Sequence, residues 1–311
     1  MIAFVFPGQG SQKVGMGADL AAASQVARET FEEVDEALSQ KLSALMAGGP
    51  EDELTMTANA QPAIMANALA IARVLEAGGL SLSAKGEAVA GHSLGEYSAL
   101  AAVGAFSLAD TARLLRIRGD AMQAAVPVGL GGMCALLGAD IEKAAALAEA
   151  AAQGDVCEVA NDNDPGQVVL SGHLAAIDRA VELAKEYGCK RAIKLPVSAP
   201  FHCSLMGPAA EKMAEALAAT PPQAFRLPLY ANVTAAPVTD AGTELDLLVQ
   251  QITGRVRWRE SVAAMADAGI THFVELGGKV LSPMIKKIAP DATTTSVVTM
   301  DDIEALAKEI G

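Results

Sequence analysis

Apolar segments with strand and helix periodicity alternate along the chain. Residues 2–6 (IAFVF) form a continuous apolar run before Pro-Gly, which predicts a buried strand. A second strand is predicted at 86–90, followed by helices at 95–104 and at 108–125, the latter N-capped by Ser107. This alternation predicts a mostly parallel sheet covered by helices on both faces. Further helices are expected up to about residue 47 and at 61–78, 203–219, 244–253, 258–268, 279–288 and the C-terminus, and strands at 226–231, 271–276 and 294–298.

A regular block of short elements interrupts this pattern. From residue 131 onward the order is strand (MCALLG), helix (140–152), strand (VCEVAN), strand (PGQVVLSG), helix (173–187) and strand (RAIKLPV). This βαββαβ order is typical of a ferredoxin-like unit. Because the longer α/β pattern resumes afterwards, we expect an inserted small domain at 129–198. A large α/β domain would then consist of 1–128 and 199–311.

Charge and composition limit the class of partner and the compartment. The chain has 311 residues, of which 51% are hydrophobic, and a net charge of −14. Nucleic acid is not an expected partner, because phosphate binding needs clustered Lys and Arg. The longest uncharged run, between Asp120 and Asp140, contains Pro127 and several glycines and does not fit a membrane span. With no signal-peptide pattern and no CxxC among four cysteines, we expect a cytoplasmic protein with reduced thiols.

One serine stands between two glycines at a predicted strand-to-helix turn. The stretch Gly91-His92-Ser93-Leu94-Gly95 has the G-x-S-x-G pattern of a nucleophile elbow. Such a turn exposes the serine hydroxyl above the carboxyl edge of the sheet. The N–H group of Leu94, at the start of the helix, can donate to a developing oxyanion. The alternative is a glycine-rich turn whose serine only caps the helix.

A nucleophilic serine needs a base, and the chain has four histidines. His202 is the candidate, because it follows a proline at a predicted helix start in SAPFHCSLM. The side chain of His92 should point away from Ser93 if strand geometry continues, and His173 and His272 begin a helix and a strand. No acidic residue stands in a convincing triad motif. A backbone carbonyl is therefore a possible orienting group for the base.

Two further segments could contact a ligand. FPGQGSQ (6–12) is similar to a dinucleotide loop, but Lys13 stands where the third glycine would be needed, so no nucleotide cofactor is expected. Gln12 could instead supply a second oxyanion N–H. Arg118, near the end of a largely apolar helix, could bind a substrate carboxylate through two parallel hydrogen bonds. The alternative for Arg118 is an ion pair with Asp120.

Seven motifs together resemble those of the malonyl-CoA:acyl-carrier-protein transacylase family. They extend in order over almost the whole chain, which makes the set far more specific than any one of them. They are FPGQGSQ (6–12), GHSLGEYSAL (91–100), RGDAMQAAVP (118–127), NDNDPGQVVLSG (161–172), SAPFHCSLM (198–206), YANVTA (230–235) and FVELGGKVL (273–281).

The resemblance implies an α/β-hydrolase-like large domain with a ferredoxin-like insertion, and a role for each matching residue. Ser93 would accept the acyl group, with His202 as the base. Arg118 would hold the malonyl carboxylate, and the backbone carbonyl of Gln251 would orient the histidine. The remaining implied site residues are the oxyanion-hole members Gln12 and Leu94 and the pocket residues Asn161, Asn232 and Phe201.

The family's reaction transfers malonyl from malonyl-CoA to the phosphopantetheine thiol of acyl carrier protein in fatty-acid biosynthesis, with no metal or other cofactor. Leu94 and Phe201 resemble the residues of malonyl-selective members. One departure is that only Gly277-Gly278 precede Lys279, where the family usually has a triplet, so the local turn is one residue shorter.

The expected partners are malonyl-CoA and an acyl carrier protein, with no nucleic acid or membrane, and the chain is expected to be a monomer. Acyl carrier proteins are acidic, and so is this chain, so docking needs a local positive patch. Lys185, Lys190, Arg191 and Lys194 cluster at the end of the inserted unit and are the candidates; the alternative is a solvated rim.

Two other functions remain open from the sequence. A serine hydrolase would use the same chemistry with water as the acceptor, but its triad carboxylate is not evident. A catalytically silent module that binds acyl carrier protein would form no covalent acyl-enzyme. A polyketide system could also use the same transfer reaction.

Overall fold

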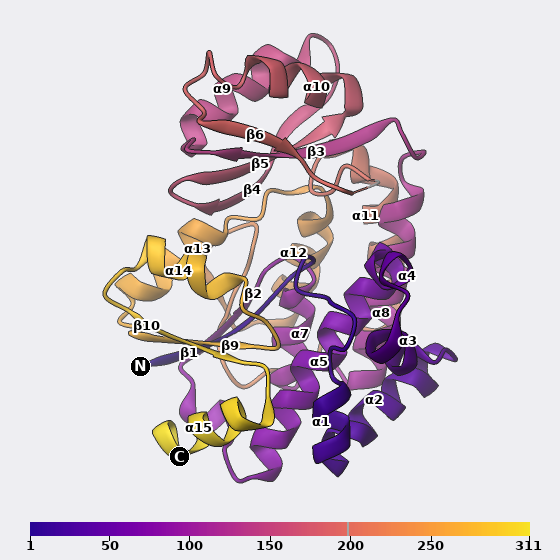
Figure 1. The fold of residues 1–311 in the computed structure, drawn as a ribbon, viewed down its shortest axis with the longest axis vertical. Helices are drawn as coiled ribbons and strands as arrows, with labels where there is room; N and C mark the ends of the chain where they lie inside the picture. Colours follow the sequence, from indigo (N-terminus) through magenta and orange to yellow (C-terminus); the bar gives the residue numbers. More distant parts are fainter. Residues whose placement is uncertain (198) are drawn as a thin grey trace.

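A computed structural model describes residues 1–197 and 199–311 and has two separate sheets flanked by helices (Figure 1). The larger sheet has the order β10-β9-β1-β2-β7-β8, and all neighbouring strands are parallel except β7 and β8. The predicted mostly parallel sheet is therefore confirmed. Its strands are β1 (Ile2–Phe6), β2 (Ala88–Gly91), β7 (Leu229–Tyr230), β8 (Pro237–Val238), β9 (His272–Leu276) and β10 (Thr293–Val297).

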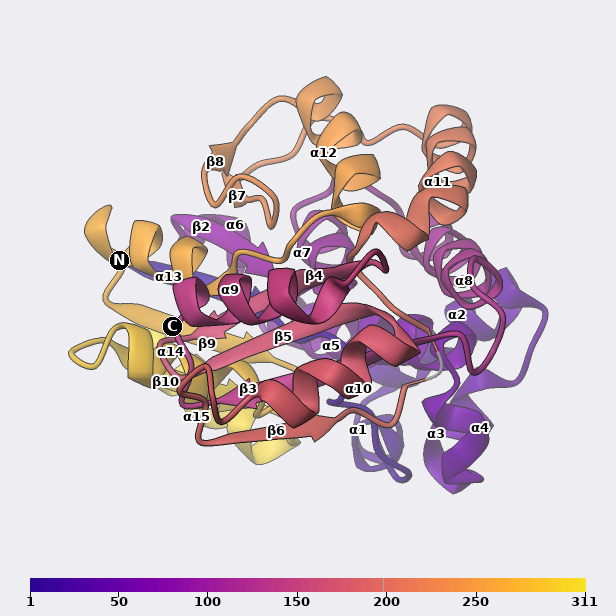
Figure 2. The same cartoon turned by 90° about the horizontal axis from the view of Figure 1, so that it is seen from above.

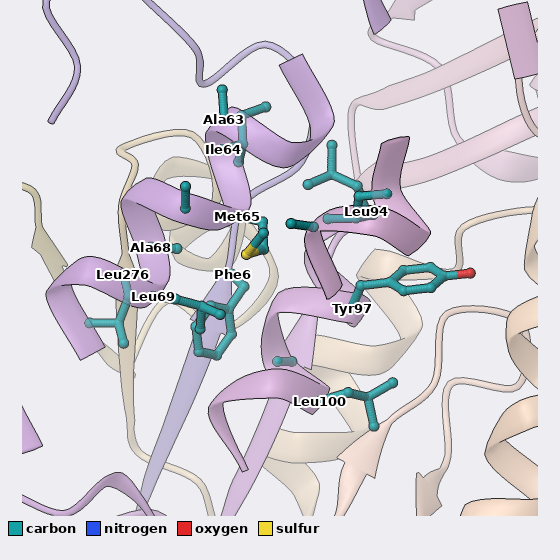
Figure 3. Packing of buried hydrophobic residues seen from close by; sticks show 14 of the residues in the cluster. Phe6, Ala63, Ile64, Met65, Ala68, Leu69, Leu94, Tyr97, Leu100 and Leu276 are labelled. Carbon is teal, nitrogen blue, oxygen red and sulfur yellow. The ribbon is translucent and has the colours of Figure 1, made fainter. Parts of the chain in front are cut away.

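Helices cover this sheet on both faces. Successive side chains of a strand point to opposite faces, so each set of alternate residues packs against its own layer of helices. Phe4 and Phe6 of β1 pack with the residues of α5 (Thr57–Ala77) and α7 (Gly95–Ala102). Ala3 and Val5 pack on the other side, with α13 (Trp258–Asp267) and α14 (Leu281–Ile288). In the first layer, Met65, Ala68 and Leu69 of α5 surround Phe6, next to Tyr97 and Leu100 of α7 (Figure 3). The elements that carry the elbow therefore rest on a dense aliphatic core.

The other helices complete these layers. They are α1 (Ala18–Ala23), α2 (Gln25–Leu38), α3 (Leu42–Gly48), α4 (Glu51–Thr55), α6 (Leu82–Lys85), α8 (Leu108–Ala124), α11 (Gly207–Ala219), α12 (Ala241–Thr253) and α15 (Met300–Ile310). As predicted, the side chain of Ser107 caps α8, accepting from the N–H of Asp110. None of the helices within the described residues is long and apolar enough to cross a bilayer.

The smaller sheet is antiparallel throughout, with the order β4-β5-β3-β6. Its strands are β3 (Gly131–Leu137), β4 (Cys157–Asp164), β5 (Gln167–His173) and β6 (Arg191–Lys194). Cys134 and Leu136 of β3 pack under α9 (Ile141–Ala152) and α10 (Leu174–Leu183), which cover one face (Figure 2). Met133 and Ala135 point the other way and join the main core. The predicted end of this unit, residue 198, lies outside the described residues.

Strand β4 fixes the small sheet to the large one. The N–H of Asp162 donates to the carbonyl of Val256 at 2.9 Å, and Asn161 forms a parallel bridge with the same residue. The buried carboxylate of Asp162 accepts three hydrogen bonds of 2.8–3.1 Å from the Arg259 guanidinium. The Asp162–Arg259 contacts are part-buried and charge-assisted, and they hold the small sheet against α13, which packs on the large sheet.

The predicted elements are found, with boundary differences. The strand expected at 226–231 is only Leu229–Tyr230, and β8 was not predicted, because a two-residue strand has no readable period. The helix expected at 203–219 begins as a 3₁₀ turn at Ser204–Met206 before α11. The helix expected at 173–187 ends at Leu183.

Candidate active site

The turn between β2 and α7 requires both of its glycines. A Cβ on Gly91 would lie 1.9 Å from the carbonyl carbon of Gly95, and a Cβ on Gly95 would lie 2.2 Å from the carbonyl oxygen of Phe6. Neither approach leaves room for a side chain. Between them Ser93 has a φ of 54°, which is uncommon for a non-glycine residue. This backbone raises the serine hydroxyl into the cavity above the sheet.

Ser93 and His202 lie in direct contact. The Ser93 Oγ is 2.7 Å from His202 Nε2, and His202 Nδ1 is 2.9 Å from the carbonyl oxygen of Gln251. Since a carbonyl can only accept, Nδ1 carries the proton and Nε2 is free to accept from the serine. Burial, and then the positive charge of Arg118, lowers the pKa of His202 to about 3. The imidazole is therefore neutral at physiological pH and able to act as a base.

Arg118 is buried beside the serine, with only 1% of its surface exposed. Its Nη1 donates to Gln61 Oε1 at 2.8 Å, and its Nη2 donates to Gln251 Oε1 at 2.8 Å and to Ser93 Oγ at 3.1 Å. Its Nε has no partner within the described residues. The alternative ion pair with Asp120 is absent from the ion pairs of the described chain. A buried guanidinium held by neutral acceptors is a ready site for an anionic ligand.

A cavity of about 260 Å³ lies over these groups, between the large and small sheets. Seven of the predicted site residues line it: Gln12, Ser93, Leu94, Arg118, Asn161, Phe201 and His202. The backbone N–H groups of Gln12 and Leu94 have no acceptor in the described part of the chain, so both can donate to a ligand. His92 also lines the cavity, but its Nε2 pairs with Asn163 Oδ1 at 2.8 Å, which leaves His202 as the base.

Two predicted residues lie behind the cavity rather than in its lining. Asn232 is fully buried; its Oδ1 accepts from the N–H of Ser93 at 2.8 Å, and its Nδ2 donates to the Gly91 carbonyl at 2.6 Å. It stabilises the elbow and was expected to line the pocket. Gln251 is also fully buried and presents its backbone carbonyl to His202, which is the geometry expected for it.

The predicted docking residues lie on the exposed edge of the small sheet. Lys190 and Arg191 are at the start of β6, and Lys194 is at its end, next to the cavity-lining Leu195. Lys194 forms an ion pair with Asp178. Lys190 and Arg191 therefore lie at the end of β6 remote from the cavity.

Several polar residues around the site were not predicted from the sequence. Gln61, from helix α5, supports Arg118, and Glu96 and Glu244 are buried behind Gln251. The sequence signal that could have identified Gln61 is its place in the apolar run of residues 60–72, since a buried polar side chain is normally hydrogen-bonded to a partner. No cluster of His, Cys, Asp or Glu that could hold a metal occurs in the described residues.

Comparison with known proteins gives one consistent result. The acyl transferase domain model matches residues 3–287. The malonyl CoA-acyl carrier protein transacylase of Escherichia coli K12 is 45% identical over 309 residues, covering 99% of each chain. The crystal structure of an acyl-carrier-protein S-malonyltransferase from Bartonella henselae is 51% identical, with a TM-score of 0.97 and coverage of 100% of this chain and 99% of that one.

A further solved structure holds a malonyl-transacylase in complex with its type II polyketide acyl-carrier protein. It is 38% identical, with a TM-score of 0.95 and coverage of 99% of both chains. Both the sequence and the structural likeness extend over the full length, elbow and small sheet included. This chain belongs to the malonyl CoA-acyl carrier protein transacylase family of acyl transferases.

Proposed function

We propose that this enzyme transfers the malonyl group from malonyl-CoA to the phosphopantetheine thiol of an acyl carrier protein, in fatty-acid biosynthesis. The names of its relatives support both substrates. The observation that carries the proposal is the buried Arg118 guanidinium, 3.1 Å from the oxygen of a serine that is itself 2.7 Å from a neutral histidine. This combination joins a nucleophile to a receptor for a carboxylate.

The reaction has two half-reactions that use the same groups. His202 Nε2 takes the proton of the Ser93 hydroxyl as its oxygen attacks the thioester carbonyl. The oxyanion accepts hydrogen bonds from the N–H groups of Leu94 and Gln12. The C–S bond then breaks, the CoA sulfur takes the proton from His202, and malonyl-Ser93 remains.

The carrier-protein thiol completes the cycle by the reverse steps. His202 takes the thiol proton as the sulfur attacks the malonyl ester. The tetrahedral intermediate collapses, the C–O bond to Ser93 breaks, and the serine oxygen recovers the proton. Neither half-reaction consumes an oxidant, a reductant or a metal. In each, His202 takes one proton from the attacking group and returns it to the leaving group.

Arg118 makes the site selective for a malonyl group. A buried guanidinium without an anionic partner is costly, and an acetyl group brings no carboxylate to it. The apolar side chains of Leu94 and Phe201 complete the pocket around the acyl group.

The finer architecture belongs to the same proposal. A large α/β-hydrolase-like domain (1–128 and 199–311) would carry Ser93 and His202, and a ferredoxin-like domain (129–198) would cover them. The strand order β6-β3-β5-β4 with α9 and α10 on one face supports the second assignment. We also propose that the enzyme is a cytoplasmic monomer that binds the acidic carrier protein through Lys190, Arg191 and Lys194.

Intact-protein mass spectrometry after brief incubation with malonyl-CoA tests the function. We expect a malonyl-sized mass increase in the wild type and none in Ser93→Ala. Transfer of that mass to an acyl carrier protein completes the assignment. Fast release of CoA with no adduct and no thiol acceptor would indicate a hydrolase, and intact malonyl-CoA with no adduct would indicate a silent binding module.

A further inference from the structure

Two buried carboxyl groups face each other behind the site, and the mechanism above does not use them. Glu96 is on α7 and Glu244 is on α12, and both are fully buried. Their side chains contact each other, and neither forms an ion pair within the described residues. Burial raises the pKa of both groups, and the neighbouring Glu96 raises that of Glu244 further. Two such carboxyls are stable together only if they share a proton.

Glu96 directs its remaining acceptor capacity at the residues that shape the site. Its Oε2 accepts from the backbone N–H of Asn232 at 2.9 Å and from Gln251 Nε2 at 3.1 Å. Asn232 in turn accepts from the N–H of Ser93 at 2.8 Å. Asn232 therefore links the Glu96 carboxylate to the backbone N–H of Ser93 through two hydrogen bonds.

Gln251 contacts Glu96 and two further groups of the site. Its side-chain Oε1 accepts from Arg118 Nη2 at 2.8 Å, and its backbone carbonyl accepts from His202 Nδ1 at 2.9 Å. Because an amide has one acceptor end and one donor end, the bonds from Nε2 to Glu96 at 3.1 Å and to the Ser93 carbonyl at 2.9 Å decide which end faces Arg118. If the Gln251 side chain rotated, Arg118 would lose an acceptor, whereas the backbone carbonyl that accepts from His202 is held by helix α12.

We propose that Glu96, which lies against Glu244, is a positioning residue for acyl transfer that orients the side chain of Gln251 and, through it, Arg118. This inference rests on the proposed function and adds residues to its machinery. Glu96 touches no reacting atom. The amide of Gln251 can bridge the Glu96 carboxylate and the Arg118 guanidinium only if the Glu96 oxygen keeps its position.

Because charged and titratable groups surround Glu96, a substitution there could change the rate of acyl transfer in two ways. Glu244 lies on α12, Tyr97 on α7 and Arg118 on α8, with the guanidinium carbon 5.7 Å from the centre of the Tyr97 ring. Glu96 could act through its charge on Arg118 or through the position of its oxygen. The structure favours position, since Glu96 and Arg118 bind opposite ends of the same amide.

Two substitutions separate position from charge. Glu96→Asp keeps the charge but withdraws the acceptor oxygen by about 1.5 Å, the length of one carbon–carbon bond. Glu96→Gln removes the charge but keeps an acceptor oxygen at the same distance, and its NH₂ group can donate to Glu244. The matched control is Glu275→Asp, because Glu275 is also fully buried and accepts four hydrogen bonds from Val280–Ser282, outside the cavity lining.

The measurement is the single-turnover rate of malonyl loading onto Ser93, with acetyl loading measured in parallel. We expect Glu96→Asp to be about 10- to 100-fold slower, as for a buried donor left without its acceptor. Its ratio of acetyl to malonyl loading should rise, because Arg118 loses its orientation. Glu96→Gln should stay within about threefold of wild type, and Glu275→Asp should match the wild type.

Other outcomes identify which idea fails. A wild-type rate and wild-type discrimination in Glu96→Asp would overturn the inference, and so would a slower rate in Glu96→Gln than in Glu96→Asp, which would point to charge. If Glu96→Asp does not fold, Glu244→Asp moves the proton-sharing partner, and the inference requires at least a tenfold loss there. If the wild type itself forms no malonyl-serine, the proposed function fails instead.

Discussion

Replacing Arg118 by alanine should convert a malonyl-selective enzyme into one that also accepts acetyl groups. The guanidinium is 99% buried and makes its hydrogen bonds to the neutral side chains of Gln61, Gln251 and Ser93. A substrate carboxylate would therefore be its only anionic partner at hydrogen-bond range. The alanine variant loses that contact while keeping the serine, the histidine and the Gln251 carbonyl that orients it.

The size of the expected loss in kcat/KM follows from the burial of the contact between Arg118 and the substrate carboxylate. Truncating one partner of a buried, hydrogen-bonded charge pair costs about 2–5 kcal/mol. Expressed as kcat/KM for malonyl-CoA, the loss is between about 30-fold and several thousandfold. An acetyl group makes no such contact, so its kcat/KM should stay level or rise. The ratio of the two specificity constants should therefore fall by at least about 30-fold.

A competition assay measures this ratio directly. Wild type and Arg118→Ala are given equal concentrations of malonyl-CoA and acetyl-CoA, and the two acyl-enzymes are quantified by mass after a brief reaction. Arg113→Ala is the matched control, because Arg113 is on the same helix but exposed and paired with Asp110. A ratio in Arg118→Ala within about threefold of wild type, well below the expected loss, would refute the assignment of the carboxylate site.

Three more predictions concern the turn, the base and the docking surface. Gly95→Ala should lower the free energy of unfolding by about 1–3 kcal/mol, because its Cβ would lie 2.2 Å from the carbonyl oxygen of Phe6; an unchanged urea midpoint would contradict this. The kcat/KM for malonyl loading should stay level as the pH falls from 7 to about 5, because burial lowers the pKa of His202 to about 3 and the base stays neutral; a half-maximal rate near pH 6.5 would show an unperturbed histidine. Charge reversal at Lys190 and Arg191 should raise KM for the carrier protein and leave loading from malonyl-CoA unchanged, and an equal KM would exclude this surface.

Local patterns along the chain were sufficient for the elements and for the chemistry of the nucleophile. The period of the apolar residues predicted the strands of both sheets except β8, because that period is set by the geometry of each element alone. The G-x-S-x-G spacing predicted the elbow, since both glycines are needed within five residues of backbone. The absence of a triad carboxylate motif correctly left room for a backbone carbonyl next to His202.

Contacts between distant segments needed the folded chain. Whether Arg118 faces a substrate carboxylate or pairs with Asp120 depends on which way its helix faces, and the sequence left both open; in the structure the guanidinium lies beside Ser93. Asn232 was expected in the pocket and instead lies beneath the elbow, because β7 runs beside β2.

Glu96 lies in the GHSLGEYSAL motif, but nothing in the sequence pairs it with Glu244. The two residues are 148 positions apart and meet only because α7 and α12 both pack behind the site. Sequence by itself determined which residues could do the chemistry, since the identity of a nucleophile, a base or a cation is a local property. Tertiary structure alone decided which of them share a hydrogen bond, because long-range packing sets the distances and excludes the water on which the strength of those bonds depends.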